Sequence, residues 1–193
     1  MPPAAQAIHP AQTALLIMDV QPSIVAMHDA AHTAGLLPRL RTLRDAARAA
    51  GIMVIHVVVA FRPGHPEIGD ANPTFSQIKA NGRLVDEDVH PDLAPGPGEI
   101  VVRKRRVSAF SGSDLGVILR AHRIHHLVLT GIATSGVVLS TVREAADLDY
   151  RLTVIEDACL DAKPQVHEVL TREVFPRQAT VMSAQTFAAA LRA

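Results

Sequence analysis

The sequence is poor in several features that particular classes of protein require. Aromatic residues make up 3% of the 193 residues and tryptophan is missing, so the chain has few platforms on which single-stranded nucleic acid could stack. Its 19 basic and 19 acidic residues are interspersed and give a formal net charge of +0. Because no basic stripe can neutralise phosphates, we expect no nucleic-acid partner.

Long apolar runs and cysteines are scarce as well. No run approaches the roughly 18 apolar residues of a membrane-spanning helix, and the first residues, MPPAAQAIHPAQ, lack the basic and apolar parts of a secretory signal. The single cysteine, Cys159, excludes an internal disulfide. These features predict a cytoplasmic protein without a membrane partner, in which residues 1–12 form a loose arm and 13–193 form a single domain.

Apolar segments of strand length alternate with segments of helical period along the chain. Strands that are apolar on both faces and separated by helices predict a doubly wound, three-layer α/β/α fold around a six-stranded, mainly parallel sheet. The predicted strands are 13–20, 52–61, 99–104, 125–132, 150–158 and 179–184. The predicted helices are about 36–50, 113–122, 136–149, 164–174 and 184–192.

The segment 62–98 does not follow this alternation. It is rich in proline and glycine and has only a weak helical pattern. A connection of this length inside a compact domain is usually functional, so we expect it to form a wall of a site or a contact between subunits.

Ligands of open α/β sheets bind outside the carboxyl ends of the strands. Asp19 and Gln21 follow the first predicted strand, Phe61 and Arg62 follow the second, and Lys104 ends the third. These residues therefore gather at the edge where a site is expected. Gln21, Phe61 and Arg62 are candidate substrate contacts on position alone.

Asp19 and Lys104 have the chemistry of an acid–base pair. Asp19 ends the apolar run LLIMD, where burial raises the pKa of a carboxyl group and suits it to proton transfer, although a helix cap is the plain alternative. Arg103, Lys104 and Arg105 belong to a basic run, which would ordinarily be solvated. Because side chains alternate along a strand, Lys104 points to the side opposite Arg103 and Arg105 and could face inward. At adjacent strand ends, the two groups would hold each other charged.

The turn after the fourth strand reads GIATSG and is built from small residues. Gly131, Ala133 and Gly136 let the backbone approach a ligand, and the helix that follows points its free N–H groups at the turn, where they could bind an oxyanion. Thr134 and Ser135 suit helix N-caps better than nucleophiles. There is no G-x-S-x-G elbow, and no histidine follows where it would complete a serine-hydrolase triad.

Cofactor and metal sites are not expected. DVQPSIV stands where a dinucleotide-binding chain would carry glycines after the first strand. The ten histidines are scattered without carboxylates at ligand spacing, so surface or core positions explain them better than a metal site. Cys159 is flanked by acids in EDACLD, which would raise the pKa of its thiol, and we expect it to be inert.

Four stretches together resemble the isochorismatase-like hydrolases, also called cysteine hydrolases, over about residues 12–190. They are ALLIMDVQ, VVRKRRVSAFSGSDLGVILR, LVLTGIATSGVVLSTVREAADLDYRLTVIEDAC and FPRQATV. The resemblance implies an Asp, a Lys and a nucleophilic Cys at three strand ends. Asp19 and Lys104 match the first two, but Val137 stands where the Cys belongs. A cis peptide commonly precedes this turn and would correspond to Ile132-Ala133.

Without the Cys, the covalent route of the family is closed at Val137. Isochorismatases, which also lack it, imply a precedent in which the Asp acts as a general acid. The leading hypothesis is a metal-free hydrolase of a small molecule that uses Asp19 and Lys104, with the backbone of 133–137 binding oxygen. The alternatives are a non-catalytic small-molecule binder and an amidase that uses Ser135 or Thr134. Family members often form dimers or tetramers, so the resemblance also implies a homo-oligomer.

Overall fold

A computed structural model of the chain describes residues 7–192, apart from the side chains of 31 and 32. Its centre is a six-stranded sheet in the order β3-β2-β1-β4-β5-β6, in which every pairing is parallel. The three-layer α/β fold and all six predicted strands are therefore confirmed. The strands are β1 (Thr13–Met18), β2 (Met53–Val59), β3 (Ile100–Lys104), β4 (His126–Ile132), β5 (Arg151–Leu160) and β6 (Thr180–Met182).

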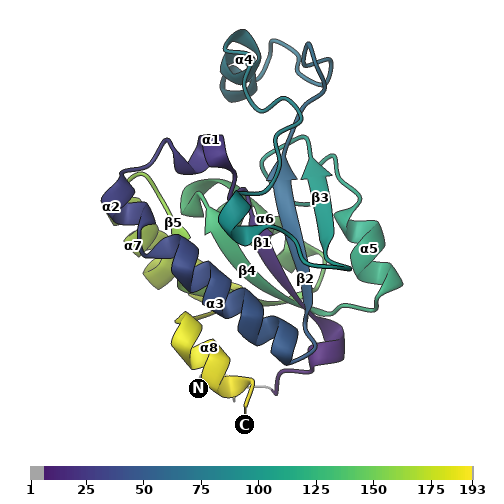
Figure 1. Cartoon of the computed structure of the whole chain (residues 1–193), viewed down its shortest axis with the longest axis vertical. Coiled ribbons are helices and arrows are strands. Elements are labelled where there is room, and N and C mark those ends of the chain that lie inside the picture. Colours follow the sequence, from purple (N-terminus) through teal and green to yellow (C-terminus); the bar gives the residue numbers. More distant parts are fainter. Residues whose placement is uncertain (1–6, 193) are drawn as a thin grey trace.

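Helices cover both faces of the sheet (Figure 1). On one face lie α3 (Leu36–Ala49) and α8 (Ala184–Ala190). On the other lie α5 (Leu115–Ala121), α6 (Leu139–Asp147) and α7 (Pro164–Val169). Short helices α1 (Pro22–Val25) and α2 (Ala30–Thr33) follow β1.

The sandwiched sheet explains why its strands are apolar throughout. All six residues of β1 are buried. Leu16 and Met18 pack into the cluster under α5 and α6, whereas Leu15 and Ile17 pack into the cluster under α3. Alternate side chains of a strand point to opposite faces, so a strand covered on both sides must be apolar at every position.

The part of the segment 62–98 around α4 (Pro73–Ala80) forms an arm that projects beyond the carboxyl edge of the sheet (Figure 1), and the later part returns along α3, where Leu93 is fully buried. The N-cap of α4, Asn72, accepts a hydrogen bond from the Phe75 N–H. The guanidinium of Arg106 lies 5.3 Å from the centre of the Phe75 ring, and it also donates to the carbonyl of Glu67. The basic run after β3 thus fastens the arm to the body of the protein.

Three boundaries differ from the sequence prediction. β5 continues to Leu160, two residues beyond its predicted end, so Cys159 lies inside the strand. β2 ends at Val59, and the predicted helix 136–149 begins with a π-helical turn at Thr134–Val138 before α6. The turn is kinked at Gly136, whose backbone angles are not helical, because the chain must fold back sharply from β4 before α6 can start.

The amino-terminal segment is described from residue 7 onwards, and the part of the expected loose arm in residues 1–6 lies outside the described residues. Residues 10–12 form a 3-10 turn, and the carbonyl of Ala7 accepts a hydrogen bond from Arg151. Within 7–192, no helix is long and apolar enough to cross a membrane.

Candidate active site

Asp19 and Lys104 meet at the carboxyl edge of the sheet. Lys104 Nζ lies 2.9 Å from Asp19 Oδ2, and their side chains are only 1% and 8% exposed. The prediction that Asp19 and Lys104 end adjacent strands is wrong, because β2 lies between β1 and β3. Asp19 and the long Lys104 side chain meet across the end of the intervening strand.

The two oxygens of Asp19 have different surroundings. Oδ2 is paired with Lys104, whereas Oδ1 is buried and has no hydrogen-bond partner among the described residues. Burial raises the pKa of Asp19 to about 6, and Lys104, together with a smaller contribution from the Val59 backbone N–H, only partly opposes this shift. A carboxyl group with such a pKa and one free oxygen can hold or release a proton near neutrality.

Lys104 uses all three of its donors inside the protein. Besides Asp19, it donates to the carbonyls of Arg106 at 2.9 Å and Val107 at 3.0 Å. Strand alternation is visible in the neighbouring Arg103, whose side chain is 44% exposed where that of Lys104 is 1%. All three N–H donors of Lys104 are therefore used within the protein, and none is left for a further anion.

The ends of β1 and β4 approach each other unusually closely beside Asp19. Met18 pairs with Gly131, and a Cβ on Gly131 would lie 2.1 Å from the Met18 carbonyl oxygen. Only glycine fits there, so its role is contact with β1, whereas the sequence suggested contact with a ligand. The Ile132-Ala133 peptide bond that follows is cis, as the family resemblance implied.

Two amides of the turn are already engaged. The Ser135 N–H donates to Asp161 Oδ2 at 2.7 Å, and the Gly136 N–H donates to the Ala133 carbonyl at 3.0 Å. Burial alone would raise the pKa of Asp161, but the hydrogen bonds from Ser135 and Lys163 outweigh it and hold that pKa below its ordinary value. Asp161 thus braces the turn from the far end of β5.

A histidine that was not predicted as a site residue lies against this turn. His167 Nδ1 is 2.9 Å from the hydroxyl oxygen of Thr134, whose side chain is fully buried. His167 belongs to α7, which begins shortly after the carboxyl end of β5. Ligands of such sheets bind at the carboxyl ends of the strands, and α7 starts at that edge. His167 could therefore have been named as a candidate from its position after β5.

The three candidate substrate contacts have partners within the protein. Gln21 is fully buried and makes two hydrogen bonds with the backbone of Val59, at 2.8 and 3.1 Å. Phe61 is fully buried, and Arg62 is 65% exposed and paired with Glu67 at 2.5 Å. Their roles as substrate contacts stay predictions, and Gln21 would first have to leave Val59.

Neither Val137 nor Cys159 supplies a nucleophile. Val137 is 2% exposed and belongs to the apolar cluster under α6. Cys159 is buried within β5, and burial raises the pKa of its thiol to about 12, with smaller contributions from Asp157 and Glu156. A thiol with that pKa stays protonated near neutrality and reacts poorly.

Two surface hollows lie away from Asp19. One, of about 600 Å³, is at the amino edge of the sheet near Arg48 and Glu99, and another, of about 500 Å³, lies between α5 and α6. Neither is lined by Asp19 or Lys104, so the chemistry of the pair, and not the size of a hollow, identifies the candidate site. Within residues 7–192, no three metal-ligating side chains come together.

Known proteins resemble this chain over nearly its whole length. The sequence model of the isochorismatase domain matches residues 13–186. The ureidoacrylate amidohydrolase RutB of Pantoea ananatis is 34% identical over 209 aligned residues, which cover 96% of this chain and 80% of that protein.

Solved structures extend the comparison. A cysteine hydrolase from Pseudomonas syringae superimposes with a TM-score of 0.88 at 22% identity, covering 97% of this chain and 95% of the other, which shows the shared fold. The N-carbamoylsarcosine amidase of Thermoplasma acidophilum superimposes with a TM-score of 0.73 at 26% identity and covers 90% of this chain and 96% of its own.

Proposed function

The chain belongs to the isochorismatase family of hydrolases, and on that premise we propose that it hydrolyses a small molecule by acid–base chemistry at Asp19. No covalent intermediate on a cysteine is involved, because Val137 has no atom that can donate an electron pair. Water is then the nucleophile, and the side chain of Asp19 moves the proton.

The free oxygen of Asp19 is the observation that carries this proposal. Oδ1 is buried and makes no hydrogen bond with the described residues 7–192, although an unpaired buried polar atom costs free energy and is uncommon in folded proteins. We infer that substrate or the reacting water makes this hydrogen bond.

With an amide or ureido compound, Asp19 protonated at Oδ1 gives its proton to the leaving nitrogen as the C–N bond breaks, water adds to the carbonyl carbon, and the proton that this water loses restores Asp19. With a vinyl ether, Asp19 protonates the terminal vinyl carbon, water adds to the resulting oxocarbenium carbon and returns a proton to Asp19, and the hemiketal then separates into a ketone and an alcohol.

Lys104 and the turn hold this arrangement. Because all three donors of Lys104 are used internally, we assign it the positioning and charge balance of Asp19 rather than the binding of a substrate anion. The turn 133–137 lies at the same edge, and its amides that are not engaged with Asp161 or Ala133 are the candidates for binding a developing negative charge.

The substrate is proposed from the names of the relatives. Ureidoacrylate amidohydrolase and N-carbamoylsarcosine amidase are named for C–N cleavage. A ureido or carbamoyl compound is therefore the first class to test, and a vinyl ether, whose cleavage needs only protonation and water, is the second.

The decisive experiment measures hydrolysis of ureido, carbamoyl and vinyl ether compounds by the wild type and by Asp19→Asn. We expect turnover to fall by at least about 100-fold in the variant, since general acid–base groups contribute about 10²–10⁴-fold. Cys159→Ser is the matched control and should keep its activity. Turnover that survives in Asp19→Asn would overturn the assignment. Binding of a compound without any turnover would favour a non-catalytic binder, the alternative that Val137 suggests.

A second candidate is an amidase whose nucleophile is Thr134. The 2.9 Å contact of its hydroxyl with His167 supports it, because an imidazole can accept the hydroxyl proton. Its buried hydroxyl would have to become accessible, whereas Ser135 is exposed but has no such base. A serine-directed phosphonate probe followed by mass spectrometry would label Thr134 or Ser135 only if this candidate holds, and Thr134→Val would abolish the label.

Two broader predictions accompany the function. The single cysteine fits a protein that works in the reducing cytoplasm. We also propose that the chain is a homo-oligomer, since relatives commonly assemble.

A further inference from the structure

The turn at Thr134–Val138 depends on contacts from outside itself. It joins β4 to α6, and Ala133, which precedes its first helical residue, provides no side-chain cap. Gly136, in the middle of the turn, has backbone angles that are not helical. Neither a cap nor a regular helical run therefore fixes the direction in which the amides of this turn point.

Two side chains that follow β5 contact consecutive residues of the turn. Asp161 Oδ2 accepts the Ser135 N–H at 2.7 Å, and His167 Nδ1 lies 2.9 Å from the Thr134 hydroxyl oxygen. Burial would raise the pKa of Asp161, and the charge of His167 is one of the influences that lower it, so these two side chains are near neighbours. The segment after β5 thus holds the turn at two adjacent points.

The contact between Thr134 and His167 is internal to the protein. Thr134 is fully buried, so its hydroxyl meets the histidine and not solvent. His167 is half-buried, and within residues 7–192 its other ring nitrogen, Nε2, has no hydrogen-bond partner. The histidine therefore uses Nδ1 to fix the orientation of Thr134, whichever of the two atoms carries the proton.

We propose that His167 is a positioning residue for the proposed hydrolysis, and that it fixes the direction of the turn 133–137 through the Thr134 hydroxyl. The inference rests on the proposed function, in which free amides of this turn bind the developing negative charge. Such amides stabilise a transition state only when they are oriented before the reaction, so that no reorganisation is needed as charge develops. His167 itself touches no reacting atom, and Thr134 transmits its effect.

This role differs from that of a base for a Thr134 nucleophile. A nucleophile must reach the substrate, whereas Thr134 has no exposed surface. A positioning contact needs no exposure, and burial favours it, because a hydrogen bond is stronger in a low dielectric than in water. The buried hydroxyl therefore fits the support of the turn better than attack on a substrate.

Three substitutions of His167 separate the position of one ring nitrogen from the bulk of the ring. His167→Asn places an amide where Nδ1 lies, His167→Gln places it where Nε2 lies, and His167→Ala removes both. We expect the Ala and Gln variants to lower kcat by about tenfold or more, since a misplacement of about 1 Å can cost about 100-fold, and the Asn variant to stay within about threefold of the wild type. KM should change by less than about twofold throughout, because the amides bind charge that is present only in the transition state. The assay uses whichever ureido, carbamoyl or vinyl ether compound the wild type turns over.

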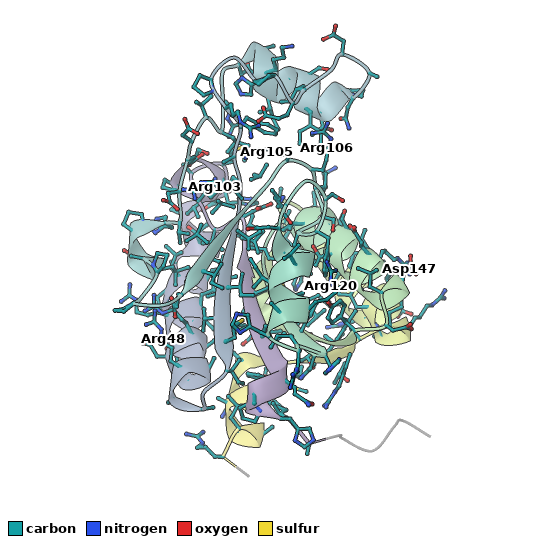
Figure 2. All side chains as sticks on the ribbon, turned by 90° about the vertical axis from the view of Figure 1, so that its right-hand side faces the viewer. Arg48, Arg103, Arg105, Arg106, Arg120 and Asp147 are labelled. Atoms are coloured by element: carbon teal, nitrogen blue, oxygen red, sulfur yellow. The ribbon has the colours of Figure 1, made fainter. Side chains whose placement is uncertain are left out.

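A double-mutant cycle tests whether His167 acts through Thr134. Thr134→Val should lower kcat by about the same factor as His167→Ala, and the double variant should be no slower than either. His122→Ala is the matched control. His122 is exposed and follows α5, the helix that carries Arg120 in Figure 2 and lies across the sheet from α7 in Figure 1. Independent, multiplying losses in the double variant would overturn the proposal. So would complete loss of turnover in His167→Ala together with phosphonate labelling of Thr134, since His167 would then be the base of a nucleophile.

Amide hydrogen exchange of the peptide that spans the turn gives a readout without a substrate. Exchange should be faster by about threefold or more in His167→Ala and His167→Gln, and unchanged in His167→Asn and His122→Ala. A wild type without turnover on any compound would overturn the proposed hydrolysis, and exchange would still decide whether His167 holds the turn. Unchanged exchange in His167→Ala would overturn the inference. An Asn variant as impaired as the Ala variant, with native circular dichroism, would overturn it as well.

Discussion

Asp19 and Glu99 are two carboxylates with almost equal exposure of their side chains and opposite behaviour. Asp19 follows β1 at the carboxyl edge of the sheet, and Glu99 precedes β3 at the amino edge. Their side chains are 8% and 9% exposed. Yet the pKa of Asp19 is raised to about 6, and that of Glu99 is lowered to about 2.

The depth of burial and hydrogen bonding together account for the difference, since Asp19 lies deeper in the protein than Glu99. Burial by itself would raise both pKa values, but Glu99 accepts hydrogen bonds from Arg48 at 2.6 and 2.8 Å and from the Gly96 N–H at 2.8 Å, and its Oε2 lies 3.0 Å from His56 Nε2. Among the described residues, Asp19 is paired with Lys104 at Oδ2 and receives only a small further contribution from the backbone N–H of Val59. Glu99, whose oxygens accept several hydrogen bonds, therefore has a structural role. Asp19, which keeps an oxygen without such a bond, is available for chemistry.

The largest change should follow from removing the counter-charge of Asp19. Lys104→Met leaves the carboxylate buried without a cation, and loss of one partner of a buried ion pair costs about 3–5 kcal/mol. Urea unfolding at pH 8 should show this loss. At pH 5 the loss should be smaller, because the carboxyl of Asp19 can then take up a proton. An equal loss at both pH values would contradict the assignment of Asp19 as the titrating group.

Asp19→Asn should change how stability depends on pH. The pKa of Asp19 is about 6 in the folded protein and 3.8 ordinarily, so the folded state binds the proton more tightly and its ionisation costs stability. Relative to the variant, the wild type should therefore lose about 3 kcal/mol as the pH rises from about 4 to 7, at about 1.4 kcal/mol per pKa unit. Chemical denaturation of both proteins across this range measures the difference, and parallel curves would sink the interpretation.

Glu99→Gln should have a smaller effect with the opposite dependence on pH. Hydrogen bonds to a charged group contribute about 1.5–3 kcal/mol, and the amide keeps some of them, so we expect a loss of about 2 kcal/mol. The folded-state pKa of Glu99 is depressed, so the contribution of its charge is present above pH 4.5 and disappears as the pH falls towards 2. The difference in the free energy of unfolding between Glu99→Gln and the wild type should therefore become smaller as the pH falls. The variant should still hydrolyse the substrate.

Cys159→Ser should have the smallest effect. Its thiol is buried and lies at 4.0 Å from the Leu129 carbonyl, so the exchange for a hydroxyl should cost about 1 kcal/mol or less, within the usual range for single substitutions. Catalytic activity should be unchanged. Thermal unfolding and the hydrolysis assay together check this expectation, and a loss of turnover would return Cys159 to the list of candidate nucleophiles.

The sequence predicted the fold well, because the strands of a sheet covered on both faces must be apolar at every position. Such strands can be recognised directly in the sequence. It also brought Asp19 and Lys104 to one edge. It did not predict that β2 separates their strands, since strand order is decided by packing between distant segments. Nor did it predict the contact of His167 with Thr134 or the pairing of Gln21 with Val59, which depend on side chains 33 and 38 positions apart.

Because the Lys104 amine is bonded entirely within the protein, its chemical reactivity reports whether the structure around Asp19 has opened. The chain has three lysines, and Lys79 and Lys163 are exposed whereas Lys104 gives all its donors to Asp19 and two carbonyls. An amine-reactive reagent should acetylate Lys79 and Lys163 in the native protein and spare Lys104. Any acetylation at Lys104 then counts the molecules in which this corner of the sheet has opened, so peptide mass spectrometry can follow opening without a substrate.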